Sequence, residues 1–309
     1  MILTVTLNAA LDITYRLPRL RPHHSHRISE VIERPGGKGV NVARVLATLG
    51  HETVATGLVG GATGAALRDQ LGAYPGVADA FVPIAGTTRR TVGLVDAASG
   101  DTTQLNEPGP QVTPAEWAAF ADRYAELLTG AAAVALCGSL PPGLPVGAYA
   151  QLIRTARTAD VPVLLDTSGE PLRRGIAARP DIVKPNAEEL AALTGSTEPV
   201  RAARDARRRG AHAVAASLGP DGLLAVTGDG AWRASPPARI AGNPTGAGDS
   251  AVAGLLSGLA EGLPWPERLA RAVALSAATV RSPVAGEYDA ATYAELLPKV
   301  RVSPHPAAA

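Results

Sequence analysis

The feature that most constrains this fold is a regular alternation of short apolar segments with longer amphipathic ones along 309 residues. The short segments have the length and the Val, Leu, Ile and Ala content of buried strands, and the longer ones repeat apolar residues with helical spacing. Strands are expected at residues 2–7, 53–59, 80–84, 133–137, 161–166, 181–184 and 213–217, with a hairpin over 222–234. Strands that alternate with helices form βαβ units. The pattern therefore predicts an α/β protein of three layers, with a mainly parallel central sheet between two layers of helices.

Two segments, at about 13–34 and 86–107, break this rhythm. Both alternate polar and apolar residues, as exposed strands do, so we expect them to form a small β lid. No linker, internal repeat or run of like charges divides the chain. We therefore predict one domain over residues 1–309, with the lid as its only appendage.

Composition excludes several classes of function. The net charge is +1 and charged residues are mixed along the chain, which argues against nucleic acid or an anionic membrane as the main partner. Cys137 is the single cysteine, so no intramolecular disulfide or cysteine-based metal site is expected. His23, His24 and His26 lie in a proline-rich exposed segment, and we predict no metal site there. Without a membrane-length apolar run or a recognisable leader, we expect a soluble cytoplasmic protein.

Residues 242–259, GNPTGAGDSAVAGLLSGL, read as a glycine-rich loop that leads into a buried helix. The amides of Gly246, Ala247 and Gly248 would lie at the helix N-terminus, where unpaired N–H groups favour an anion. A carboxylate beside such an anion site, Asp249, suits a general base that takes a proton from a hydroxyl. This pairing is what phosphoryl transfer to an alcohol requires. The structural alternative is a glycine turn in which Asp249 is only a favourable partner of the helix dipole.

The same residues also match G-x-G-x-x-A, a pattern of dinucleotide-binding enzymes. The context disfavours that interpretation, because no βαβ unit follows and a Pro-Trp-Pro segment stands where an acid should end the next strand. A non-catalytic sensor on the same fold is a third alternative, which the presence of Asp249 disfavours.

Further polar residues follow the predicted strands, and ligands of such sheets bind beyond the carboxyl ends of the strands. Lys38, in GGKG, begins a helix, but Gly39 follows it where a P-loop needs Ser or Thr. Asn186 and Glu189 have the spacing of a capping box, and alternatively would order a metal and water around a triphosphate. The Ser217–Gly222 segment is either a simple turn or a phosphate-contacting loop.

Taken together and in this order, TGAGD, KPN with its following Glu, SLGPDG and GGKG make the chain resemble the ribokinase-like PfkB carbohydrate kinases over nearly its whole length. The resemblance implies a ribokinase-like fold, an ATP and Mg²⁺ requirement, and a role for each matching residue. The implied catalytic residues are the base Asp249 and the anion hole of Gly246, Ala247 and Gly248. The implied acceptor-binding residues are Asp12, Gly37, Lys38, Asn41, Arg89 and Ser139. The implied nucleotide-binding residues are Lys184, Asn186, Glu189, Ser217, Gly219 and Gly222.

Within that family the chain is most similar to the 1-phosphofructokinase and tagatose-6-phosphate kinase branch, through TLNAALD, GTTRRTV, LNEPGP and GSLPPG. The likeness implies phosphorylation of fructose 1-phosphate to fructose 1,6-bisphosphate, with Lys38 and Arg89 on the acceptor's phosphate. Tagatose 6-phosphate, fructose 6-phosphate, or an unphosphorylated sugar or nucleoside are the alternative acceptors. The resemblance also implies that Mg²⁺ is held through ATP and water near Asn186 and Glu189, with no direct protein ligand. Exposed lid edges lead us to expect a homodimer.

Overall fold

The computed structural model describes residues 1–28, 30–282 and 286–305, and its centre is a sheet of eleven strands. From one edge to the other, the strands are β5 (Val77–Asp79), β4 (Thr53–Val59), β1 (Ile2–Thr6), β9 (Ala133–Cys137), β10 (Val163–Asp166), β11 (Ile182–Val183), β12 (Ala213–Ser217), β13 (Leu223–Val226), β14 (Ala231–Ser235) and β15 (Arg301–Pro304), while β6 (Val82–Pro83) pairs with β4. Pairing is parallel from β5 to β12 and antiparallel from β12 to β15. The predicted mainly parallel sheet is therefore confirmed.

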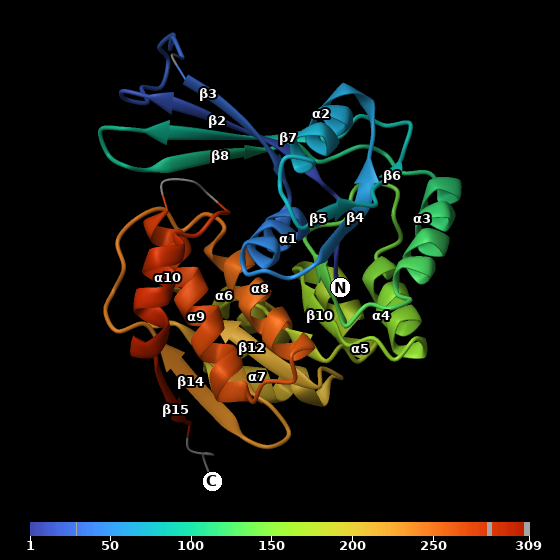
Figure 1. The fold of residues 1–309 in the computed structure, drawn as a ribbon, viewed down its shortest axis with the longest axis vertical. Coiled ribbons are helices and arrows are strands. Elements are labelled where there is room, and N and C mark those ends of the chain that lie inside the picture. The colour runs from blue at the N-terminus through green and yellow to red at the C-terminus, as the bar shows by residue number, and fades with distance from the viewer. Residues whose placement is uncertain (29, 283–285, 306–309) are drawn as a thin grey trace.

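Helices cover both faces of this sheet (Figure 1), because its strands are apolar on both sides. In β1, Leu3 and Val5 point into one core cluster and Ile2 points into the other. The first face is covered by α3 (Pro114–Leu127), α4 (Ala148–Thr158), α5 (Gly169–Ala177), α6 (Ala187–Thr194) and α7 (Pro199–Arg208). The second is covered by α1 (Lys38–Thr48), α2 (Gly61–Leu71), α8 (Ala247–Ala260), α9 (Trp265–Arg281) and α10 (Ala290–Leu296). The short 3₁₀ turns are η1 (Gly219–Asp221) and η2 (Leu297–Lys299).

A second sheet of four strands, which we call the lid sheet, extends beyond the main body (Figure 1). Its order is β3 (Glu30–Gly36), β2 (Ala10–Leu17), β7 (Arg89–Asp96) and β8 (Thr102–Asn106). The β2–β7 pair is parallel and the outer pairs are antiparallel. Its strands come from the two segments for which the sequence predicts a lid, and its action as a lid remains a prediction.

The local predictions differ from the structure mainly at the sheet edges. Strands β4, β9 and β12 have the expected bounds, whereas the strand expected at 80–84 is reduced to β6. Strand β15 was not expected, because its residues are mostly exposed and show no apolar alternation. It is a strand because the edge of β14 offers unpaired backbone groups. No helix among the described residues is both long and apolar enough to cross a membrane.

Candidate functional site

A cavity of about 860 Å³ opens where the parallel strands end at their carboxyl side, beside the lid sheet. Parallel strands bring their carboxyl ends to one edge, so residues that are distant in the sequence meet there. The predicted site residues that line it are Asp12, Gly37, Lys38, Asn41, Arg89, Ser139, Lys184, Asn186, Glu189, Ser217, Gly246, Gly248 and Asp249.

A second cavity, of about 470 Å³, adjoins the first and is lined by the other three predicted residues, Ala247, Gly219 and Gly222. Asn186, Ser217 and Gly248 line both cavities. The remaining walls of the second cavity are largely apolar and come from α8, α9 and the chain before α8. They include Ile240, Ala251, Val273, Ala277 and Val280. The structure therefore gathers every predicted site residue into two connected spaces, one polar and one mostly apolar.

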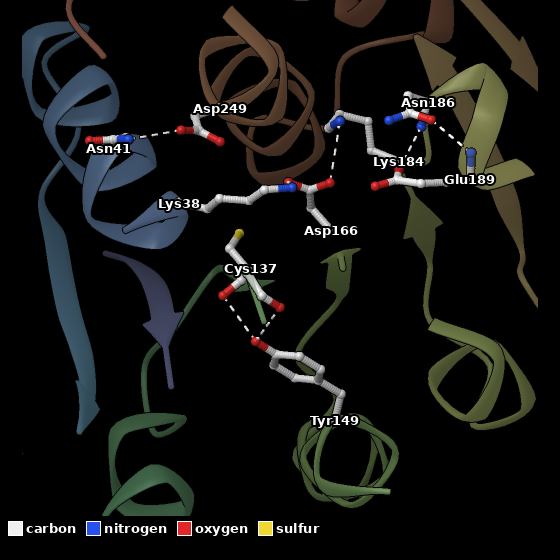
Figure 2. Close-up of polar contacts among 10 residues, drawn as sticks. Lys38, Asn41, Cys137, Tyr149, Asp166, Lys184, Asn186, Glu189 and Asp249 are labelled. Carbon is white, nitrogen blue, oxygen red and sulfur yellow. Dashed lines mark hydrogen bonds and ion pairs between the residues drawn. The ribbon is translucent and has the colours of Figure 1, made fainter. Parts of the chain in front are cut away.

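Asp249 lies buried in the first turn of α8, at the wall of the larger cavity. Gly246 caps this helix with φ of 83°, a left-handed conformation that glycine adopts without strain. The Asn41 side-chain amide donates a 2.8 Å hydrogen bond to Asp249 Oδ2 (Figure 2). Burial raises the pKa of Asp249 to about 6, although nearby Lys38 and the Asn41 bond pull it downward. Asp249 is thus a carboxyl group that changes charge close to neutral pH.

Beneath the cavity, Asp166 lies between two lysines (Figure 2). Lys38 Nζ is 3.1 Å from Asp166 Oδ2, and Lys184 Nζ is 3.3 Å from Oδ1. Burial alone would raise the pKa of Asp166, but the two ammonium groups outweigh it and hold that pKa below its ordinary value. The carboxylates of Asp166 and Asp249 in turn raise the pKa of Lys38 against the effect of burial. The cavity floor therefore carries two fixed positive charges around one carboxylate.

Sequence reasoning missed Asp166 as a site residue, although the strand expected at 161–166 ends on it. Its side chain is only 2% exposed, and an isolated aspartate in a sequence carries little signal. The usable signal was its place at the carboxyl end of a strand, the same rule that identified the other polar residues.

The capping box expected at the start of α6 is present. Asn186 Oδ1 accepts from the Glu189 amide at 2.7 Å, and Glu189 Oε2 accepts from the Asn186 amide at 2.8 Å. Both side chains also line the polar cavity. The structural interpretation is therefore correct, and it leaves room for a role at the cavity.

On the lid side, Asp12 faces the cavity from β2. Burial raises its pKa to about 6, while Arg89 opposes the shift and Asp249 adds to it. Gly36 must lack a side chain here, because a Cβ would lie 2.1 Å from Asp12 Cγ. Arg89, at the start of β7, is held by the backbone carbonyls of Asn8 and Glu107, each 3.2 Å away.

Asn8 and Arg90 are neighbours of these residues, and they differ in whether they line the cavity. Asn8, which follows β1, donates a 3.1 Å hydrogen bond to Ser139 Oγ, so it links two cavity loops. Arg90 is exposed and forms a 2.9 Å ion pair with Glu107. The second arginine of GTTRRTV therefore does not line the cavity, whereas Arg89 does.

The family description "pfkB family carbohydrate kinase" matches residues 5–290. The chain belongs to the pfkB family of carbohydrate kinases. It is 45% identical over 284 residues to 1-phosphofructokinase of Rhodobacter capsulatus, which covers 89% of this chain and 90% of that protein. Its fold superimposes on phosphofructokinase-2 from Escherichia coli with a TM-score of 0.91 at 31% identity, covering 96% of this chain and 98% of that one.

Arabidopsis thaliana ribokinase is a more distant structural neighbour, with a TM-score of 0.75 at 25% identity, covering 96% of this chain and 98% of that one. The expected ribokinase-like α/β fold is therefore confirmed. Like other pfkB proteins, the chain is a kinase, an enzyme that transfers phosphate to a hydroxyl group of a carbohydrate.

Proposed function

We propose that this pfkB kinase transfers the γ-phosphoryl group of ATP to the free primary hydroxyl of fructose 1-phosphate, giving fructose 1,6-bisphosphate. The observation that carries the proposal is the buried carboxylate of Asp249, at a helix N-terminus, in one cavity with Asp12 and Arg89. The name and 45% identity of the Rhodobacter capsulatus relative favour this acceptor.

In the proposed reaction, Asp249 accepts the proton of the acceptor hydroxyl while the hydroxyl oxygen forms a bond to the γ-phosphorus. The bond between that phosphorus and the bridging oxygen breaks, and ADP leaves with the electron pair. The amides at the start of α8 stabilise the charge on the transferring group. Asn41 keeps the Asp249 carboxylate in place through its 2.8 Å hydrogen bond.

ATP would lie across both cavities. The mostly apolar cavity between α8 and α9 suits a purine base, and it joins the polar cavity at Asn186 and Ser217. The triphosphate would then reach Lys184 on the positively charged floor of the polar cavity. This placement brings the γ-phosphate to the N-terminus of α8, where Asp249 lies.

Mg²⁺ would be held through the ATP phosphates and water near Asn186 and Glu189. The described residues contain no group of three His, Cys, Asp or Glu side chains arranged to bind a metal directly. The available donors at Asn186 and Glu189 are nevertheless oxygens, which Mg²⁺ prefers. When bound, the ion would neutralise charge on the phosphates.

The acceptor's phosphate would bind to Arg89 and Lys38. ADP release should be measured for wild type and Arg89→Ala over fructose 1-phosphate, fructose 6-phosphate, tagatose 6-phosphate, and unphosphorylated sugars and nucleosides. Arg89→Ala should raise the KM for the phosphosugar by about tenfold or more, because a charge-assisted contact is lost. Arg90→Ala is the matched control, since Arg90 itself does not line the cavity, although its ion-pair partner Glu107 does.

An unchanged KM in Arg89→Ala would reject a phosphosugar acceptor. Preference for fructose 6-phosphate is the second candidate, favoured by the structural similarity to phosphofructokinase-2. The same panel of acceptors separates the two.

The lid sheet is also the proposed homodimer interface, because its edge strands carry exposed apolar side chains, Val31 and Leu105. The cytoplasm is the proposed location, since ATP and phosphorylated sugars occur there.

A further inference from the structure

Glu287 connects the lid sheet to the main body. Its Oε1 accepts a hydrogen bond from Arg34 Nη1 at 3.1 Å and another from Arg44 Nη2. Arg34 lies on the lid strand β3, whereas Arg44 lies on α1. One carboxylate near the carboxyl end of the chain thus joins two elements that the sequence separates from it by more than half its length.

Helix α1 carries residues of the site, and β3 pairs with a strand that does. Arg34 lies directly opposite Asp12 in the β2–β3 register. Arg44 lies on the same helix as Asn41, about one turn further along. Gly286, which precedes Glu287, lies so close to Asn41 that a Cβ would be 2.9 Å from Asn41 Oδ1. The segment that holds Glu287 therefore packs directly on the residue that donates to Asp249.

The two arms of this bridge differ in character. The Arg44 guanidinium is 3% exposed and lies 4.5 Å from the centre of the Tyr74 ring. Within the described residues, its Nε has no hydrogen-bond partner, so Glu287 is the carboxylate that compensates its buried charge. Arg34 is partly exposed, and removing it would leave no buried charge unpaired. The contact with α1 is thus a structural requirement, whereas the partly exposed contact with the lid strand costs little to break.

We propose that Glu287 is a positioning residue for phosphoryl transfer, which ties the lid strand β3 to α1 and, through Gly286 and Asn41, to Asp249. Closure of the lid over the acceptor and orientation of the Asp249 carboxylate then depend on the same contacts of Glu287. The inference rests on the proposed function, in which Asp249 is the base. It assigns no contact with substrate to Glu287 itself.

The lid arm is tested by Arg34→Leu, which leaves the Arg44–Glu287 pair intact. The KM for the acceptor should rise by about threefold to fivefold, the range of a partly exposed ion pair, while kcat stays within about twofold. Glu30→Gln is the matched control, because it breaks the exposed ion pair between Glu30, on the same strand as Arg34, and Arg16 on β2, and its kinetics should equal those of wild type. Equal KM values in Arg34→Leu and Glu30→Gln would overturn this half of the proposal.

The link from Glu287 through α1 to Asp249 is tested by a double-mutant cycle of Glu287→Gln and Asn41→Ala. Glutamine keeps the size of Glu287 and one acceptor oxygen but removes its charge. Glu287→Gln should lower kcat by about tenfold, and the double variant should be no slower than Asn41→Ala alone, since both changes act through one group. A merely structural role for Glu287 would instead multiply the two losses, and that outcome would overturn the proposal.

Asp249→Asn, measured in parallel, separates this inference from the proposed function. Turnover that survives in Asp249→Asn contradicts the assignment of the base. An inactive Asp249→Asn together with multiplying losses in the cycle contradicts only the role of Glu287. If Glu287→Gln does not fold, as judged by its thermal unfolding, Arg34→Leu still decides the lid arm.

Discussion

At the residue scale, the pKa of Asp249 links the structure to activity. Burial raises it to about 6, the Asp166 carboxylate adds to the rise, and Lys38, Lys184 and the Asn41 hydrogen bond oppose it. A base with this pKa is mostly ionised at neutral pH yet holds a transferred proton better than an exposed carboxylate does. The opposing charges around it therefore keep Asp249 usable as a base in a dry site.

This balance predicts the acid limb of the pH profile. A base works only when unprotonated, so kcat/KM should be full above the pKa and fall by about tenfold per pH unit below about 6. Asp12 has a pKa of about 6 as well, and it steepens the fall if its charge is also required. Asn41→Ala removes a bond that lowers the pKa of Asp249, so its acid limb should move to higher pH. A limb that stays in place in Asn41→Ala would contradict this account.

At the element scale, two helices begin with the same capping box, but only one of these boxes lies at the cavity. In α3, Thr113 Oγ1 accepts from the Glu116 amide and Glu116 Oε2 accepts from the Thr113 amide. In α6, Asn186 and Glu189 do the same at the wall of the polar cavity. The chain thus contains an internal control that separates capping from ligand binding.

Glu189→Gln and Glu116→Gln should each lower the free energy of unfolding by no more than about 1 kcal/mol, because glutamine retains an oxygen acceptor for the cap. Only Glu189→Gln should raise the KM for MgATP, by about tenfold, since it removes a charge near the proposed Mg²⁺ position. Chemical denaturation and ADP release measure the two effects. Equal KM values in the two variants would leave Glu189 with a capping role alone.

At the scale of the whole molecule, the lid sheet exposes the apolar side chains of Val31 on β3 and Leu105 on β8, which are 53% and 54% exposed. Unpaired strand edges with apolar side chains favour association with another chain. A second copy that covered the lid sheet would also stabilise the sheet that we propose to close over the acceptor side of the cavity.

Val31→Glu should therefore dissociate the proposed homodimer, because it places a charge in a desolvated contact. Sedimentation velocity at several protein concentrations measures this. Val146→Glu changes a side chain that is 43% exposed outside the lid sheet, and its oligomeric state should match wild type. A wild-type protein that sediments as a monomer throughout would contradict the proposed dimer.

Much of the candidate site could be predicted because its signals are local. The caps at Thr113 and Asn186 depend on residues three positions apart, and the loop before Asp249 depends on adjacent glycines. The rule that ligands bind at the carboxyl ends of parallel strands then collected the remaining polar residues at one edge.

By itself, the sequence determined the order of strands and helices, the three-layer α/β class and the group of residues at the strand ends, because apolar periodicity and caps are properties of neighbouring residues. Only the tertiary structure decided that Asp166 lies between Lys38 and Lys184, that β15 completes the sheet edge, and that Glu287 bridges the lid and α1. Each of these pairings joins side chains or edges from separate elements. Their partners are set by how the layers pack, and no short stretch of sequence encodes that packing.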